Sequence, residues 1–355
     1  MRKESLFGSA CYGLAVVLSC VTGAWSAPYN TTRDVFAKPS LQTLTERDVV
    51  VVEQTCLNGW PEIVRSSMGE ALDIVNYVVP RLETLTAIIS EDPVPSMALM
   101  SNADRTLFRT FESFFGQIYF GTNTQDAKDK NEDGLERVMT VLATAQNIRD
   151  ALTDPDSVNI NVYCDDGWWA NTDPAGSPRP SNRHWFDGRY WTPNNQIGAW
   201  VNIPRCRDDA RTLAYSYHPP FDVPDDAATL VLCRQGMIRW YGSYQGGDTI
   251  GQYHGPNGIR QPSNAVQLNT LSNYMPHTIL HEFTHLEPVM GIGLDDECLD
   301  NGAEVYGWRC IRQLARESPE KSVNNADSFA LFAMAIYADN NDWSTGVSRT
   351  LGFYP

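Results

Sequence analysis

The strongest constraint on the fold is a segment around residue 280 that is bounded by two prolines. Pro276 suits the first turn of a helix, where its missing N–H costs nothing, and Pro288 is expected to end that helix. Between them, His281 and His285 are four residues apart and therefore lie on one face of the helix. Two imidazoles in this arrangement can bind one metal ion, so the segment predicts a metal-binding helix.

The residue after the first histidine gives this helix a chemical role. Residues 281–285 read HEFTH, which fits the HExxH pattern in which two histidines bind zinc. Glu282 lies beside them, where a carboxylate can take a proton from a water molecule on the metal. The alternative is a half-exposed helix whose histidines and glutamate are only solvated.

The chain begins with the features of a secretory signal peptide. A basic start precedes a largely apolar run, residues 6–24, which is broken by Gly and Ser and followed by small residues. We therefore expect a signal peptide in residues 1–27, cleaved after Ala24 or Ser26, and an extracellular protein. A retained membrane anchor is the alternative, but the run is short and broken for a spanning helix.

The composition fits a globular, secreted protein. With 355 residues, 42% of them hydrophobic and 20% charged, the chain can bury a substantial core. The formal net charge of −16 argues against nucleic-acid binding and favours solubility. Of the eight cysteines, Cys11 and Cys20 fall in the signal segment, and the six that remain predict three disulfides of unknown pairing. No membrane association is expected after signal removal, and the sequence leaves the oligomeric state open.

The hydrophobic pattern divides the mature chain into a leader and one α+β domain. Residues 28–50 are polar without periodicity and predict a flexible leader. Residues 51–355 predict a single domain, with a helical lobe over 51–155 and a sheet and active-site lobe over 156–355. Helices are expected over 54–85 with a break at Pro80, and over 104–119, 135–152, 303–316 and 327–337. Strands are expected over 159–164, 199–203 and 229–233.

A long loop rich in tryptophan and tyrosine separates the first two expected strands. It covers residues 165–195 and contains many Gly, Pro and Asn residues. Two interpretations stay open. The loop is either a lid that contacts substrate or a structural loop clamped by its own tryptophans.

Three motifs in the last third of the chain resemble one family when they are taken together. They are HEFTH at 281–285, the pair Tyr306-Gly307, and the run NADSFALFA at 325–333. In order and approximate spacing they resemble the aspzincin superfamily, the deuterolysin-like and lysine-specific secreted fungal metallopeptidases. The resemblance implies a zincin-like metallopeptidase fold with a helical N-terminal lobe, a small sheet, the HExxH helix and C-terminal helices.

The resemblance also implies roles for individual residues. His281 and His285 are implied to be zinc ligands, and Glu282 is implied to be the base. Tyr306 matches a tyrosine that steadies the oxyanion, and the implied substrates are proteins or peptides. Asp327 falls in a motif that helps form an acidic specificity pocket in lysine-specific relatives, although its place before an apolar run also fits a helix N-cap.

The third metal ligand is the point at which this sequence departs from the family. The family places an aspartate three residues before the motif tyrosine, where this chain has Ala303. Glu304 is favoured instead, because its separation from the second histidine resembles that in the glutamate zincins. Asp296 and Asp300 remain alternatives, since zinc accepts any nearby carboxylate.

Two functions follow from these observations. The first is a secreted zinc metalloendopeptidase that hydrolyses peptide bonds through a metal-activated water. The second is a non-catalytic, antigen-like protein of the same superfamily that binds zinc, which the altered third-ligand motif favours. Retention of Glu282 and Tyr306 favours catalysis, because a protein that only binds zinc has no need of a base.

Overall fold

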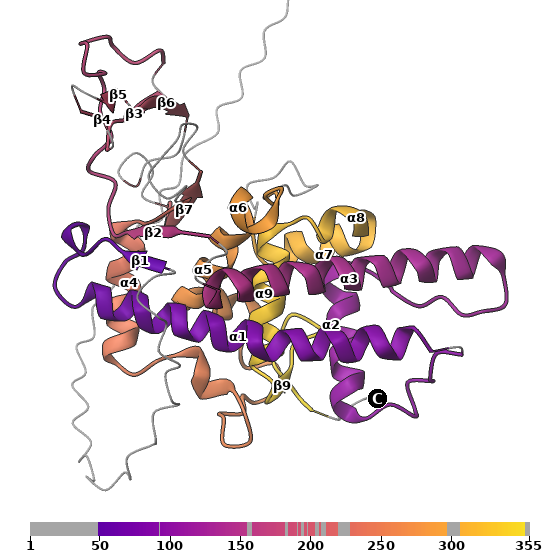
Figure 1. Cartoon of the computed structure of the whole chain (residues 1–355). Helices are drawn as coiled ribbons and strands as arrows, with labels where there is room; N and C mark the ends of the chain where they lie inside the picture. The colour runs from indigo at the N-terminus through magenta and orange to yellow at the C-terminus, as the bar shows by residue number, and fades with distance from the viewer. Residues whose placement is uncertain are drawn as a thin grey trace, which may run out of the picture. The chain divides into compact units, whose positions relative to one another are not determined.

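The structure is a computed structural model (Figure 1) that describes most of the chain beyond the leader. The described residues are 49–91, 93–154, 158–181, 184–189, 191–192, 195–196, 198–202, 206, 211–218, 228–296 and 306–351. They belong to one compact unit. Helices, a small mixed sheet and further helices follow one another, which confirms the predicted α+β class.

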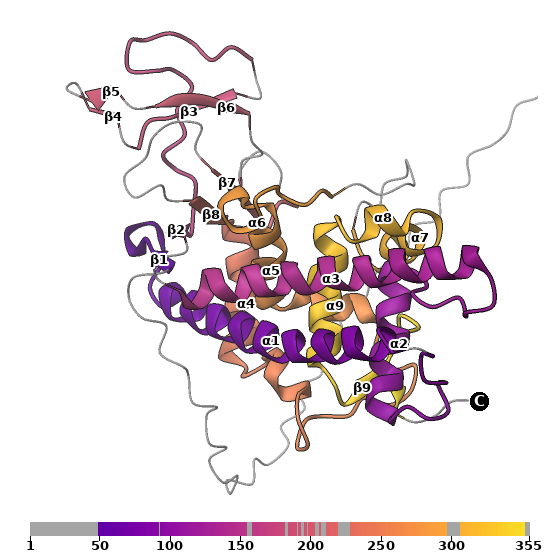
Figure 2. The ribbon, with the colours of Figure 1, turned by 45° about the vertical axis from the view of Figure 1, so that its right-hand side comes forward.

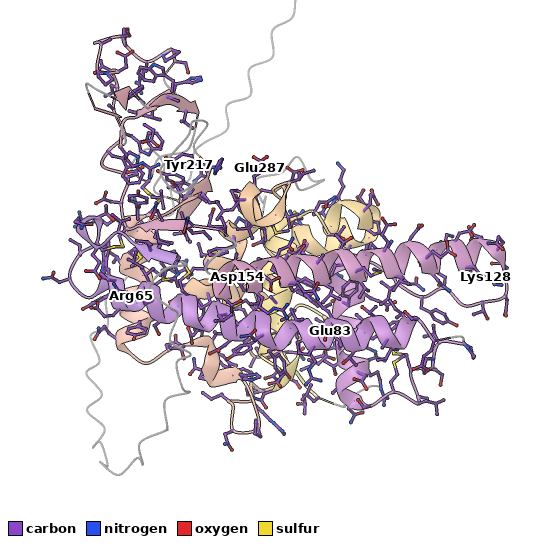
Figure 3. The ribbon with its side chains drawn as sticks, viewed as in Figure 1. Arg65, Glu83, Lys128, Asp154, Tyr217 and Glu287 are labelled. Carbon is purple, nitrogen blue, oxygen red and sulfur yellow. A yellow bond between two sulfur atoms is a disulfide. The ribbon has the colours of Figure 1, made fainter. Side chains whose placement is uncertain are left out.

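Three helices form the first part of the described chain. They are α1 (Trp60–Ile89), α2 (Asn102–Phe115) and α3 (Gln125–Thr153). Helices α1 and α3 pack side by side in both views (Figure 1 and Figure 2). Their outer faces carry exposed charged residues, three of which are labelled in Figure 3: Arg65, Glu83 and Lys128. The inner faces are apolar and share one core with the helices that follow.

The prediction that a helix breaks at Pro80 is wrong, because α1 continues through that residue to Ile89. Proline removes one N–H and leaves the carbonyl four residues earlier without its helical partner. Both Pro80 and Asn76, the residue that carries this carbonyl, are exposed, so water can satisfy the free oxygen. The buried face on either side of the proline stays packed.

The third helix is ten residues longer at its start than the sequence predicted. It begins at Gln125 because Thr124 caps it, its hydroxyl accepting a hydrogen bond from Ala127 N at 3.1 Å. An ion pair between Lys130 and Asp126, one turn apart, stabilises the first turns. Residues 125–134, which lie before the predicted start, therefore belong to the helix.

The main sheet has four strands in the order β1-β2-β8-β7. Strands β1 (Val49–Val51), β2 (Ile160–Tyr163) and β8 (Ala228–Leu232) are parallel, and β7 (Ala214–Tyr217) pairs with β8 in the antiparallel direction. Strands β2 and β8 confirm two of the three expected strands. The third, β6 (Ala199–Asn202), pairs with β3 (His184–Asp187) in a separate two-stranded sheet. Further short antiparallel pairs are β4 (Trp191–Thr192) with β5 (Asn195–Gln196), and β9 (Asn341–Asp342) with β10 (Arg349–Thr350).

The aromatic loop is held against the sheet by its own tryptophans. The Trp168 ring lies 4.5 Å from the ring of Tyr163 on β2, and Trp169 Nε1 donates to the hydroxyl of Tyr215 at 2.8 Å. The buried ion pair of Arg189 with Asp187 lies beside these rings. These contacts support the structural interpretation of the loop for its described residues.

The remaining helices surround the sequence motifs. They are α4 (Arg234–Gln245), η3 (Ile250–Tyr253), η4 (Leu268–Asn273), α5 (Met275–His285), α6 (Glu287–Met290), α7 (Trp308–Glu317), α8 (Pro319–Ser322) and α9 (Ala326–Tyr337). The motif helix α5 ends at His285, before Pro288, because the fully buried Leu286 adopts an extended conformation. Helix α7 begins at Trp308, later than expected, since Gly307 has a φ of 90° that a helix does not accept.

Disulfides cross-link the described chain near the ends of the sheet strands. Cys56 pairs with Cys164, and Cys206 pairs with Cys233. Cys310 is disulfide-bonded as well. Each bond restricts the unfolded chain and thereby favours the folded state. In the part of the chain that the structure describes, no helix is both long and apolar enough to cross a bilayer.

Candidate metal centre and active site

A cleft of about 950 Å³ lies between the edge strand β7 and helix α5. Its wall includes Ser216 from β7, and His281 and Glu282 from α5. Tyr306 and Asp327 also line it. The volume is typical of a ligand-binding cleft. The residues that line it are far apart in the sequence, from Arg211 to Asp327.

Three side chains converge on one point in this cleft. The Nε2 atoms of His281 and His285 are 3.2 Å apart. Asp296 Oδ1 lies 3.4 Å from His281 Nε2, and Asp296 Oδ2 lies 3.3 Å from His285 Nε2. Zinc–ligand bonds of about 2.0–2.1 Å in a tetrahedral arrangement place ligand atoms about 3.3–3.4 Å from one another. The three residues therefore fit a zinc ion.

An unsatisfied polar atom in the same place supports this fit. Asp296 Oδ1 is buried and makes no hydrogen bond within the described residues. A buried carboxylate oxygen without a donor is unfavourable, and a bound cation removes that penalty. This group of three is also the one set of potential metal ligands found in the described chain.

Main-chain hydrogen bonds fix His285 and Asp296 relative to each other. His285 Nδ1 donates to Leu294 O at 2.8 Å, which turns Nε2 towards the convergence point. Leu294 N donates to Thr284 O at 2.8 Å, and Asp295 bonds through its main chain to both Asn324 and Ala326. The segment that carries Asp296 is therefore held between the end of α5 and the start of α9.

The protonation of the two histidines reflects their shared carboxylate. Burial lowers the pKa of His281 to about 4, although the charges of Asp296 and Asp327 oppose it. Burial acts to lower the pKa of His285 too, but its contact with Asp296 outweighs burial and raises that pKa to about 9. Burial acts to raise the pKa of Asp296, and the two imidazoles outweigh it and lower that pKa. The ionised Asp296 thus favours a positive charge on its neighbour His285, and a metal cation can take the place of that proton.

The carboxylate of Glu282 is buried beside this group, with 7% of the residue exposed. The hydroxyl of Ser216 lies 2.9 Å from Glu282 Oε2 and 2.9 Å from Glu282 O. Burial raises the pKa of Glu282 to about 7, although the charge of His285 and the Ser216 hydrogen bond act to lower it. A carboxylate with this pKa can both accept and return a proton near neutral pH.

Tyr306 lies at the mouth of the cleft and is half-exposed. Its hydroxyl donates to Asp296 Oδ2 at 3.2 Å, and its ring lies 5.7 Å from that of His281. Burial and the Asp296 charge raise the pKa of Tyr306, so the phenol keeps its proton at neutral pH. It can therefore act as a hydrogen-bond donor in the cleft.

The buried Asp327 links α9 to α5 and to the segment of Tyr306. Its Oδ2 accepts a hydrogen bond from Gly307 N at 2.6 Å, and its Oδ1 lies 3.3 Å from His277 Nε2 and 4.0 Å from His281 Nδ1. The N-cap interpretation of Asp327 is wrong, because Asn325 caps α9 by accepting from Ser328 N. Asp327 instead lines the cleft.

Comparison with known proteins places this site in a family segment. The aspzincin family model, described as lysine-specific metallo-endopeptidase, matches residues 261–334. Two proteins described as neutral protease 2 homologs are similar to this chain, one from Pyricularia oryzae at 42% identity over 74 residues and one from Phaeosphaeria nodorum at 43% over 61 residues. Residues 261–334 form an aspzincin segment.

The extent of these matches is limited. They cover 21% and 17% of this chain, and 17% and 14% of the length of the two relatives. Among solved structures, a zinc peptidase from Grifola frondosa is similar over 79% of this chain and 96% of its own, at 16% identity and a TM-score of 0.35. The segment that the family model matches includes both histidines, Glu282, Tyr306 and Asp327.

The structure brings together most of the residues that the sequence singled out. His281, Glu282 and His285 lie in the cleft with Asp296 and Tyr306. Two of the three candidate third ligands, Glu304 and Asp300, lie outside the described residues.

Ser216, which lies outside the aspzincin segment, was not predicted from the sequence. The alternation of small and aromatic residues in Ala214–Tyr217 was the available signal for a strand there. Nothing local in that strand points to Glu282, which is 66 residues further along the chain.

Proposed function

We propose that the protein is a secreted zinc metalloendopeptidase whose metal is held by His281, His285 and Asp296. The observation that carries the proposal is the convergence of the two Nε2 atoms and the Asp296 carboxylate at 3.2–3.4 Å from one another. The aspzincin segment and the neutral protease homologs support it. We favour Asp296 over Glu304 and Asp300 because its oxygens already face both imidazoles.

The metal and the protein have separate tasks in this proposal. Bound zinc supplies a Lewis acid that polarises a peptide carbonyl and lowers the pKa of water to about 7. Glu282 takes the proton of the attacking water and later gives it to the leaving amine. Tyr306, which keeps its phenolic proton, donates a hydrogen bond to the oxyanion that forms on the peptide carbonyl. The cleft between β7 and α5 holds the peptide chain on either side of the scissile bond.

Replacement of the proposed base tests the catalytic role directly. Glu282→Gln keeps the size of the side chain but accepts no proton, so casein hydrolysis should fall by at least about 10³-fold. Zinc content, measured by elemental analysis, should stay near one ion per chain because Glu282 is not a ligand. Full activity in this variant contradicts the mechanism.

The same assay separates catalysis from zinc binding alone. A wild-type protein that binds zinc stoichiometrically but cleaves no casein at any pH supports the non-catalytic, antigen-like function. We place the protein outside the cell because of its predicted signal peptide and its disulfides. N-terminal sequencing of the protein from culture medium tests this, with a new terminus expected near residues 25–28.

A further inference from the structure

We propose that Ser216 is a positioning residue that holds the Glu282 carboxylate in its working orientation. This inference rests on the proposed function, since it assigns Ser216 a role through the base of that reaction. Ser216 lies on β7, outside the aspzincin segment, and its hydroxyl contacts Glu282. No metal ligand is involved in the contact.

The hydroxyl of Ser216 connects the side chain of Glu282 to the main chain of the same residue. It lies 2.9 Å from Oε2 and 2.9 Å from the carbonyl oxygen. A serine hydroxyl has one proton and can donate to either oxygen. A carboxylate held against its own backbone by one fixed group loses rotational freedom, so its second oxygen keeps one direction in the cleft. The proposed base is thereby oriented before substrate arrives.

The position of Ser216 is itself fixed from the other face of the strand. Side chains alternate along a strand, so Tyr215 and Tyr217 point away from α5 while Ser216 points towards it. Tyr215 accepts a hydrogen bond from Trp169 Nε1 at 2.8 Å, and Tyr217 donates to Asp187 Oδ2 at 2.5 Å. Tyr217 is labelled in Figure 3. Strand β7 lies at the edge of the sheet and pairs with β8, and these contacts with the aromatic loop hold its other residues in place.

Steady-state kinetics of three zinc-loaded variants test the inference, with a fluorogenic peptide that the wild type cleaves. Ser216→Ala should lower kcat about 10-fold and leave KM within twofold, because substrate binding does not depend on the orientation of Glu282. Ser216→Thr keeps the hydroxyl and should recover most of that loss. Ser322→Ala is the control, since the Ser322 hydroxyl, like that of Ser216, is hydrogen-bonded to a carbonyl, Pro319 O at 2.6 Å, but does not line the cleft. It should leave kcat unchanged.

A second readout does not depend on activity. Thermal unfolding of Ser216→Ala, Glu282→Ala and the double variant forms a cycle that measures whether the two side chains interact, because alanine at 282 removes the acceptor that glutamine would keep. The Tm shifts of the single variants should not add up to that of the double variant, whereas Ser322→Ala combined with Glu282→Ala should be additive. Zinc content is measured in every variant and should not change.

The outcomes separate this inference from the proposed function. A wild-type kcat in Ser216→Ala, an equal loss in Ser216→Thr, or additive Tm shifts overturn the role of Ser216 and leave the peptidase proposal intact. A wild-type protein without zinc-dependent hydrolysis overturns both, because there is then no base to position.

Discussion

A histidine and an aspartate face each other at both ends of helix α9, in two very different surroundings. Just inside its start, His277 Nε2 lies 3.3 Å from Asp327 Oδ1. Just beyond its end, His254 Nδ1 lies 3.4 Å from Asp339 Oδ1. The pairs have nearly the same separation, so distance alone does not tell a chemical site from a structural one.

Hydrogen bonding does separate the two pairs. We call the start of α9, with His277 and Asp327, its near end, and the other end, with His254 and Asp339, its far end. At the far end, His254 Nδ1 donates to Tyr337 O at 2.9 Å, and Asp339 accepts from Tyr77 at 2.6 Å and from Gly255 N at 3.0 Å. Near the start, three buried polar atoms have no hydrogen bond within the described residues: His277 Nε2, His281 Nδ1 and Asp296 Oδ1. A buried polar atom without a hydrogen bond requires an explanation, and a bound cation supplies one for Asp296 Oδ1. The far end is therefore expected to stabilise the fold, and the near end to bind metal.

The largest expected difference between the ends is in zinc binding. Asp296→Ala removes one of three proposed ligands and should weaken zinc binding by about 1,000-fold or more, equivalent to about 4 kcal/mol. Asp339→Ala, the matched change at the other end, should bind zinc as the wild type does. A competing chelator measures both affinities.

Glu304→Gln is the control for the third ligand in the same titration. It should bind zinc normally if Asp296 completes the site. Strong zinc binding by Asp296→Ala together with weak binding by Glu304→Gln reverses our assignment and restores Glu304 as the favoured third ligand.

A smaller effect on zinc is expected at Asp327. Its carboxylate lies within 4.0 Å of both His277 and His281 but does not reach the convergence point of the ligands. Asp327→Asn keeps an acceptor for Gly307 N and removes the charge, so zinc affinity should fall about 10-fold. Unchanged affinity in the chelator titration would show that Asp327 only connects α9 to the segment of Tyr306.

The effect of Asp339→Asn should appear in stability instead. This change weakens hydrogen bonds to Tyr77 and Gly255 and the contact with His254, at an expected cost of about 1–2 kcal/mol. Differential scanning calorimetry should show a Tm lower by about 2–5 °C. Asp327→Asn should lower Tm less than Asp339→Asn does and should weaken zinc binding more. A larger loss of Tm in Asp327→Asn, or a larger loss of zinc affinity in Asp339→Asn, contradicts the division of roles between the two ends.

The residues around the near end of α9 were easier to predict from the sequence than the choice of the third metal ligand. The HEFTH helix is a local feature, since its spacing and its first proline act within a dozen or so residues. The family motifs then placed Tyr306 and Asp327 near it. The choice of Asp296 was not available from spacing, because it depends on main-chain bonds that join Asp295 to Asn324 and Ala326.

The errors in the predicted fold have similar causes. Pro80 normally ends a helix, but the exposure of Asn76 let α1 continue. Ser216 was overlooked because it lies in a four-residue edge strand whose partner contacts are distant in sequence. Local patterns thus predicted elements and ligand types, whereas the pairing of distant segments decided which residues meet.

The smallest expected effect is a pH dependence of stability at the far end of α9. Burial acts to lower the pKa of His254, but Asp339 and Tyr337 O outweigh it and raise that pKa. Stabilisation by His254 is therefore complete below its unfolded pKa of about 6.5 and is lost as pH rises through the higher folded value. The pKa of Asp339 is lowered against the effect of burial, mainly by its hydrogen bond with His254, so its contribution is present above about pH 4 and is lost as pH falls through the folded value. The pair should thus stabilise most between about pH 4 and 6.5.

The two side chains are 28% and 31% exposed, and solvent screening should limit the difference in Tm between wild type and His254→Gln to a degree or two. Calorimetry at pH 5.5 should show the larger difference and calorimetry at pH 8.5 the smaller, whereas a constant difference would mean that the charge of His254 contributes nothing and that the hydrogen bonds alone hold this end.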